Sequence, residues 1–301
     1  MANYLRPIED QFALSRHNLS DTYVRRGTDA SPACSRCHTT EGYQVYLATG
    51  QEAPLEASSH ISCFACHAPH TNRDFSRRNE DSTTHLAVGG TYDKGPSNTC
   101  AVCHQVREPN PPIESSEPIT SSRWGPHHGP QSNILSGKGA YVLPGATYDA
   151  AAAHNIGITE GCVNCHMAAL PDNVVAGGHS FAITYEATSG SSTVDRVNSK
   201  GCACHGWTSD VVATTAVEAH QATFEHDLGE LGDMLVARGW LNGAKNAVTT
   251  GAAAPTTKEA RGIVFNYLML LEDKSGGVHN PKYTASIIAA AKAYLESLGP
   301  Q

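Results

Sequence analysis

Cys162-Val-Asn-Cys165-His166 is one of five places in this chain where a histidine directly follows the second cysteine of a closely spaced pair. Three others have the same two-residue spacer: Cys34-Ser-Arg-Cys37-His38, Cys63-Phe-Ala-Cys66-His67 and Cys100-Ala-Val-Cys103-His104. The fifth, Cys202-Ala-Cys204-His205, is one residue shorter. These five segments contain all ten cysteines of the 301-residue chain, so no cysteine is left for another purpose.

The pattern is that of covalent c-type haem attachment. In Cys-x-x-Cys-His, the two thiols form thioethers with the porphyrin vinyl groups and the adjacent imidazole ligates the iron. Disulfides or zinc ribbons would explain paired cysteines, but neither explains the histidine after each pair. We therefore predict five covalently attached c-type haems, whose proximal iron ligands are His38, His67, His104, His166 and His205. The fifth motif lacks one spacer residue, which changes the positions that its two sulfurs can reach relative to a full motif. This site therefore forms either one thioether or two.

Composition favours an interior filled by haem over an ordinary hydrophobic core. Hydrophobic residues make up 40% of the chain and aromatic residues 7%, beside 27 glycines and 16 prolines. Porphyrins are large, flat and apolar, and five of them would supply surface for the chain to pack against. We predict a mainly α, loop-rich multihaem cytochrome c fold in which the haems form the core.

The chain divides into two regions within one integrated domain. Residues 1–210 form the haem-binding region, with a short helix at each attachment motif and long loops between them. Residues 211–301 predict three helices, at 211–238, from the capping box Thr256-Thr257-Lys258-Glu259 to about Asp273, and from Pro281 to Leu298. Strand signals are nearly absent. We expect a C-terminal helical bundle that packs on the haem core and supplies an axial ligand.

Charge and hydropathy exclude some partners. The formal net charge of −8 argues against nucleic acid. No stretch approaches the ~18 consecutive apolar residues of a membrane span, and the first residues lack the apolar core of a signal peptide. Haem is attached to cytochromes c outside the cytoplasmic membrane. We therefore expect a periplasmic, extracellular or cell-surface protein whose export signal has been removed.

Several short segments resemble the pentahaem cytochrome c nitrite reductase family and its octahaem relatives. They are Ser15-Arg-His17, Ala33-Cys-Ser-Arg-Cys37, His154 eight residues before Cys162, Cys165-His-Met167, Gly177-Gly-His179-Ser-Phe181 and Gly277-Val-His279-Asn-Pro281. The resemblance extends over nearly the whole chain. It implies that His17 is the distal ligand of the second haem, His179 of the third, His279 of the fourth and His154 of the fifth.

Two departures from that family bear on activity. The family's first haem has a lysine ligand and an open face, whereas this chain has His38 at that position. The tyrosine and histidine of the family's substrate pocket are replaced by Gln105-Val-Arg107 and by residues of Gly137-Lys-Gly-Ala140. The chain also has surplus histidines, so we expect the first haem to be closed by His60, His127 or His128. His220 and His226 lie on a predicted amphipathic helix and are expected at its surface.

These features together predict a non-catalytic protein that transfers electrons through five closely packed bis-His haems. Its partners would be redox proteins or an extracellular electron acceptor, and it would self-associate, either as an extracellular filament (a nanowire) or as a dimer. The alternative is a pentahaem reductase of nitrite, hydroxylamine or a similar small oxyanion at the first haem. That reading requires an open iron beside polar groups such as Arg25, Arg26, Arg107 or Arg123.

Overall fold

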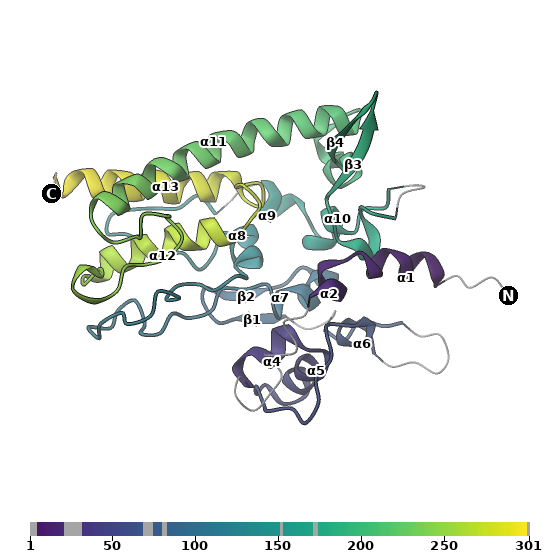
Figure 1. Cartoon of the computed structure of the whole chain (residues 1–301), viewed down its shortest axis with the longest axis horizontal. Helices are drawn as coiled ribbons and strands as arrows, with labels where there is room; N and C mark the ends of the chain where they lie inside the picture. Colours follow the sequence, from purple (N-terminus) through teal and green to yellow (C-terminus); the bar gives the residue numbers. More distant parts are fainter. Residues whose placement is uncertain are drawn as a thin grey trace. The chain divides into compact units, whose positions relative to one another are not determined.

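The computed structural model describes residues 5–20, 32–68, 75–79, 83–150, 153–170 and 174–299. The fold is mainly α and rich in loops, as predicted (Figure 1). The chain forms two compact units, each assembled from separate stretches of sequence. Unit 1 comprises residues 1–83, 93–103 and 160–215, and unit 2 comprises residues 84–92, 104–159 and 216–301.

Unit 1 is built from short helices joined by loops. Its helices are α1 (Arg6–Ala13), α2 (Arg16–Leu19), α4 (Pro32–His38), α5 (Thr40–Thr49), α6 (Cys63–Cys66), α7 (Asn98–Ala101) and α10 (Cys162–His166), with the 3-10 helices η1 (Gly95–Ser97), η2 (Gly178–Ser180) and η3 (Ser199–His205). The four full attachment motifs lie in or at the end of α4, α6, α7 and α10, and the short fifth motif lies in η3. The prediction of a short helix at each motif is confirmed.

Two antiparallel hairpins were missed by the sequence analysis. In unit 2, β1 (Thr84–Leu86) pairs with β2 (Gly90–Tyr92), and in unit 1, β3 (Thr184–Ser189) pairs with β4 (Ser192–Val197). The β3–β4 ribbon is mostly exposed, and the alternation of Tyr185 and Ala187 with polar residues in β3 is too short to mark a half-buried strand clearly. The available signals were its β-branched residues and Gly190, whose φ of +63° suits a tight hairpin turn.

Unit 2 contains the long C-terminal helices that the sequence predicted. They are α11 (Asp210–Ala237, which begins in unit 1), α12 (Lys258–Glu272) and α13 (Pro281–Ser297), with the shorter α8 (Gln131–Ser136), α9 (Ala153–Gly157) and η4 (Gly251–Ala253). All three long helices are within two residues of their expected bounds. The N-cap of α12 is Thr257, whose hydroxyl accepts from the backbone N–H of Ala260 at 3.2 Å, one residue later than the capping box implied.

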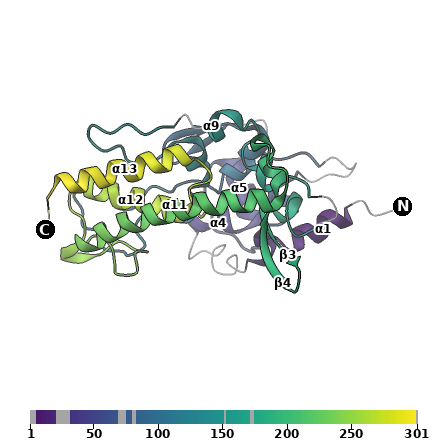
Figure 2. The same cartoon turned by 90° about the horizontal axis from the view of Figure 1, so that it is seen from above.

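The three long helices enclose an ordinary hydrophobic core in unit 2. They run alongside one another in both views (Figures 1 and 2). Helix α12 is buried from Ala260 to Leu270, as expected of a helix that is apolar all round. The buried Arg261 on α12 is satisfied by backbone carbonyls, since its guanidinium donates to Pro255 O at 3.2 Å and to the carbonyls of Ser115 and Glu117.

Unit 1 has a different interior. Its buried hydrophobic residues, among those that the structure describes, are mostly small: Tyr43, Ala65, Ala101, Val102, Ala176, Val197 and Ala213. Tyr43, Ala65 and Val102 form one cluster, against which the motif residues Cys66 and Cys103 pack. A unit of this size buries little apolar surface with such residues. It therefore relies on something besides its own side chains to fill its interior.

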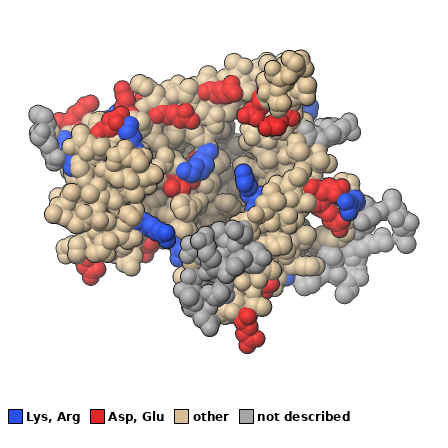
Figure 3. All heavy atoms as spheres, in the orientation of Figure 1, with Lys and Arg blue, Asp and Glu red and all other residues tan. Residues whose placement is uncertain are grey.

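Two features of the described residues concern membranes and surface charge. No helix in the described part of the chain combines the length and the apolar character that crossing a bilayer demands. On the face shown in Figure 3, the described lysine and arginine side chains are scattered and form no continuous basic surface. Such a surface is the usual mark of nucleic-acid binding.

Candidate haem iron sites

All ten cysteines belong to unit 1, the unit with the sparse apolar interior. Cysteines of different motifs lie close together there. The thiols of Cys37 and Cys103 hydrogen-bond, and this contact together with burial raises the pKa of Cys103 well above its usual value. The thiols of Cys100 and Cys162 are paired in the same way, with the same effect on the pKa of Cys100. The third motif is thus a direct neighbour of both the first and the fourth.

The fourth and fifth motifs are also neighbours. Cys165 Sγ lies 3.2 Å from the carbonyl oxygen of Gly201, at the start of the fifth motif. Burial, with the nearby Cys202 and Cys162, raises the pKa of Cys165 to about 11. If each motif attaches one porphyrin, as the sequence predicts, attachment points this close would hold their haems close together.

The fifth motif has its own local support. The carboxylate of Asp210, the first residue of α11, accepts from Ser199 N at 3.0 Å, from Ser199 Oγ at 2.5 Å and from Tyr185 OH at 2.5 Å. Burial alone would raise the pKa of Asp210, but these hydrogen bonds outweigh it and the pKa is lowered. Asp210 thereby fixes the start of η3. Within η3 the backbone is kinked at Cys202, with φ −109° and ψ 21°.

The histidines of the second and fourth motifs are held in orientations suited to metal binding. His67 Nδ1 lies 2.6 Å from Phe75 O, and His166 Nδ1 lies 2.8 Å from Phe181 O. A carbonyl accepts only, so Nδ1 carries the proton and Nε2 is the nitrogen that would bind a metal. Metal-ligating histidines almost always donate their other ring N–H in this way.

A second imidazole faces His67. The ring centroids of His67 and His179 are 6.2 Å apart with an interplanar angle of 34°. A metal held about 2.0 Å from a nitrogen of each ring would place the two centroids roughly 6 Å apart, so the gap fits an iron. Burial and the neighbouring His67 both lower the pKa of His179, which favours the neutral imidazole that ligates metals.

His17 lies near the same place. Its ring is 5.2 Å from that of Phe181, which is 5.9 Å from the ring of His179. Phe181 has a positive φ of 56°, a conformation that turns its carbonyl toward His166 Nδ1 while its ring contacts the other two histidines. Three predicted ligands, His17, His166 and His179, are therefore gathered around one residue in unit 1.

In unit 2, a segment of eight residues, Glu272 to His279, contains His279 and contacts the rings of two other histidines that the sequence singled out, His128 and His154. We call it the 272–279 loop. His279 Nδ1 lies 2.7 Å from Asp273 Oδ1, and His128 Nδ1 lies 2.8 Å from Glu272 Oε2. His154 Nδ1 lies 2.8 Å from Val278 O. Each of these rings thus turns its Nδ1 to an acceptor on the loop.

His104, the proximal histidine of the third motif, reaches the same loop through a glutamine. Its Nδ1 lies 3.1 Å from Gln131 Oε1, and Gln131 Nε2 donates to Glu272 O at 3.2 Å and to Asp273 O at 3.3 Å. The sequence missed His220, which was expected at the surface of its helix. Its Nε2 is buried with no hydrogen-bond partner and faces Gly277. The sequence feature that could have indicated the burial of His220 is its position one helical turn before the buried Phe224.

The three candidates for the first haem are differently placed. The His60 carbonyl accepts from Thr40 Oγ1 at 2.6 Å, which places residue 60 beside the turn that follows His38. His127 has a left-handed backbone, φ +67°, and its ring lies 4.7 Å from that of His128. The choice among them stays a prediction. Arg25 and Arg26, named for the reductase alternative, lie outside the described residues.

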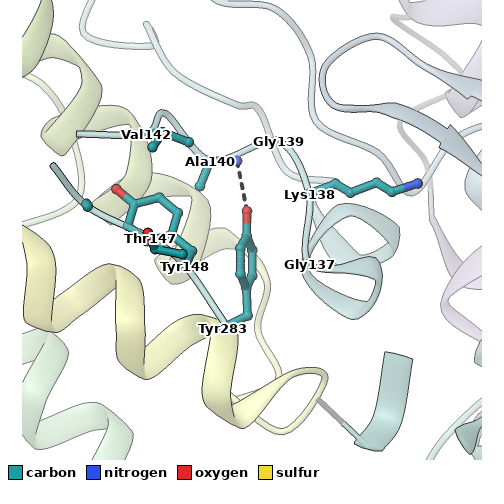
Figure 4. Close-up of a pocket in the computed structure, with 9 residues that line it drawn as sticks. Gly137, Lys138, Gly139, Ala140, Val142, Thr147, Tyr148 and Tyr283 are labelled. Carbon is teal, nitrogen blue, oxygen red and sulfur yellow. Dashed lines mark hydrogen bonds between the residues drawn. The ribbon is translucent and has the colours of Figure 1, made fainter. Parts of the chain in front are cut away.

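A small pocket of about 290 Å³ lies elsewhere in unit 2 (Figure 4). It is bordered by the Gly137–Ala140 loop, where Ala140 N donates to Tyr283 OH at 3.1 Å. The side chain of Lys138 extends away from Tyr283. None of the predicted haem residues lines this pocket, so we assign it no part in haem binding.

Comparison with known proteins supports the fold. No protein-family model matches the chain, and no curated protein matches it either. The crystal structure of the outer cell wall cytochrome OcwA is similar, with a TM-score of 0.57 and 18% identity, over 95% of this chain and 49% of that one. An undecahaem cytochrome from the S-layer of Carboxydothermus ferrireducens is similar over 95% of this chain and 41% of that one, with a TM-score of 0.52 and 20% identity. The chain thus spans less than half the length of either protein and shares the fold of the matched part of these two cytochromes.

Proposed function

We propose that the chain is an electron-transfer cytochrome with five closely packed, bis-His c-type haems. The observation that carries this proposal is the pair His67 and His179, whose rings face each other 6.2 Å apart. An iron with imidazole on both faces has no free position for a substrate and suits electron transfer. The close approach of thiols from neighbouring motifs supports tight packing of the haems.

The same geometry favours a pairing different from the one that the nitrite reductase resemblance implied. That resemblance gave His179 to the third haem. Because His179 faces His67, we pair it with the second haem instead. We keep His17, His154 and His279 as distal ligands of other haems, and His60, His127 and His128 as candidates for the first.

When bound, the haems supply one-electron redox couples. The residues of this chain set their position and environment. Carbonyls of Phe75, Phe181 and Val278 hold the rings of His67, His166 and His154, and so fix which nitrogen faces the metal. The sparse apolar interior of unit 1 leaves the porphyrins to complete its packing.

We place this activity outside the cytoplasm. The two similar structures are described as an outer cell wall cytochrome and an S-layer cytochrome, and c-type haem chemistry agrees with that location. The partners are redox proteins or an extracellular electron acceptor. Self-association as a filament or a dimer belongs to the proposal. Particle size in native extracts tests it, and a strict monomer would exclude both assemblies.

The test uses the purified holoprotein and one pair of variants. We expect five haems per chain, all low-spin in the ferric state by electron paramagnetic resonance. His179→Ala should convert about one haem in five to a high-spin form that binds carbon monoxide. His85→Ala is the matched control, because His85 lies on β1 with an exposed side chain and should change nothing.

Two results would count against the proposal. If His179→Ala leaves every haem low-spin, the pairing with His67 is wrong. If the unmodified protein binds carbon monoxide or nitrite stoichiometrically at neutral pH, an iron is open and the reductase alternative replaces electron transfer.

A further inference from the structure

Among the candidate ligands, His279 has an unusual hydrogen-bond partner. Asp273, the C-cap residue of α12, has a side chain that is 1% exposed. Its Oδ1 lies 2.7 Å from His279 Nδ1, and its Oδ2 accepts from Ser275 Oγ. If Nε2 of His279 binds iron, Nδ1 must carry the ring's proton and donate it to this carboxylate.

The other candidate ligands show a different environment at Nδ1. His67, His166 and His154 face backbone carbonyls, and His104 faces the amide oxygen of Gln131. His128 also faces a carboxylate, that of Glu272, but its side chain is 74% exposed. Water screens an exposed pair strongly. Among the described candidate ligands whose Nδ1 partner is given above, His279 is therefore the one whose partner is a carboxylate and whose ring is not strongly exposed.

The loop is built to hold this contact. Ser275 Oγ accepts from the backbone N–H of His279 at 3.3 Å, and Gln221 Nε2 of α11 donates to Ser275 O at 3.1 Å. Gly277 has a φ of +81°, and a Cβ there would lie 2.7 Å from the Phe224 ring. These contacts fix the loop between α11 and the end of α12. They therefore hold Asp273 and His279 in contact before any metal binds.

We propose that Asp273 is a positioning residue that makes His279 a stronger electron donor than the candidate ligands whose Nδ1 faces a neutral carbonyl, and so lowers the potential of its haem. This rests on the proposed function, in which His279 ligates an iron. A carboxylate that accepts the Nδ1 proton gives the ring imidazolate character and raises its basicity as a ligand. Its negative charge, buried near the metal, stabilises the ferric state over the ferrous state.

The test is a potentiometric titration of the holoprotein, followed by haem absorbance. In Asp273→Asn the amide oxygen still accepts from Nδ1 but the charge is gone. We expect one couple to move upward, changing that haem's ferric-to-ferrous ratio at a fixed potential about tenfold, equivalent to 59 mV for one electron. Glu225→Gln is the control, because it removes the charge of an exposed carboxylate on α11, and should move no couple comparably.

Two further variants keep the outcomes separate. Ser275→Ala removes a donor from Asp273, so the carboxylate should bind His279 more strongly and the same couple should move downward, even if Asp273→Asn fails to fold. His279→Ala tests the ligand assignment, since it should leave one haem high-spin. If His279→Ala leaves all haems low-spin, the ligand assignment fails and this inference with it. If it produces a high-spin haem but neither other variant moves a couple, the role of Asp273 is overturned while the proposed function stands.

Discussion

Replacing Gly262 by alanine should destabilise unit 2, although alanine is the better helix former. Gly262 is buried in α12, and a Cβ there would lie 2.1 Å from Cδ1 of Tyr141 and 2.4 Å from its Cγ. Tyr141 cannot withdraw easily, because its N–H donates to Asn266 Oδ1 at 2.7 Å and its carbonyl accepts from Asn266 Nδ2 at 2.8 Å. Both bonds attach Tyr141 to the same helix, one turn further on.

The magnitude follows from two opposing effects. Overpacking a buried site costs typically about 1–3 kcal/mol, and replacing glycine by alanine inside a helix gains roughly 0.5–1 kcal/mol. We expect a net loss of about 1–2 kcal/mol in the free energy of unfolding. Gly229→Ala in α11 is the matched control, since nothing lies within 4 Å of its Cβ position. It should gain roughly 0.5–1 kcal/mol.

Urea denaturation of the holoproteins, followed by far-ultraviolet circular dichroism, measures both variants. Both variants replace glycine by alanine inside a helix, but we expect the free energy of unfolding to fall in Gly262→Ala and to rise in Gly229→Ala. Two results would show that steric crowding against Tyr141 does not require glycine at position 262. In one, Gly262→Ala is as stable as the unmodified protein; in the other, Gly229→Ala is as unstable as Gly262→Ala.

Three other predictions concern separate parts of the chain. Because the pKa of Asp210 is lowered in the fold, its hydrogen bonds stabilise the protein above its ordinary pKa near 4 and are lost as the pH falls through the lowered value. Asp210→Asn should therefore flatten the pH dependence of stability between about pH 5 and pH 2, measured by urea melts across that range. Arg261→Met should cost roughly 2–4 kcal/mol, since it leaves buried carbonyls without donors, whereas Lys258→Met at an exposed site should cost little in the same melts. In the fifth motif Cys204 keeps the usual spacing to the histidine, so Cys202→Ala should retain five haems and Cys204→Ala should lose one, by mass spectrometry of the denatured protein.

Local patterns predicted the parts of the fold that local interactions determine. The helices α11, α12 and α13 follow from apolar spacing, a capping threonine and Pro281, and their bounds agree with the structure within two residues. The short helices at the attachment motifs also follow from sequence. The β3–β4 hairpin was missed, because an exposed two-stranded ribbon needs no apolar face and the alternation of Tyr185 and Ala187 in β3 is too short to stand out.

The distal ligands are harder to predict from the sequence than the proximal ones. A proximal histidine is fixed by its place next to a cysteine, but a distal one is chosen by where distant segments meet. His67 and His179 are 112 positions apart in sequence and are brought face to face by loops with no regular period. The resemblance to the pentahaem family implied a pairing by order along the chain, but a difference in loop length can change which histidine reaches which motif. The 272–279 loop shows the same limit, because nothing in its sequence reveals that Asp273 is buried against His279. Spacing therefore predicts the attachment sites, while the pairing of ligands and the charge beside each ring depend on tertiary contacts between segments that are far apart in the sequence.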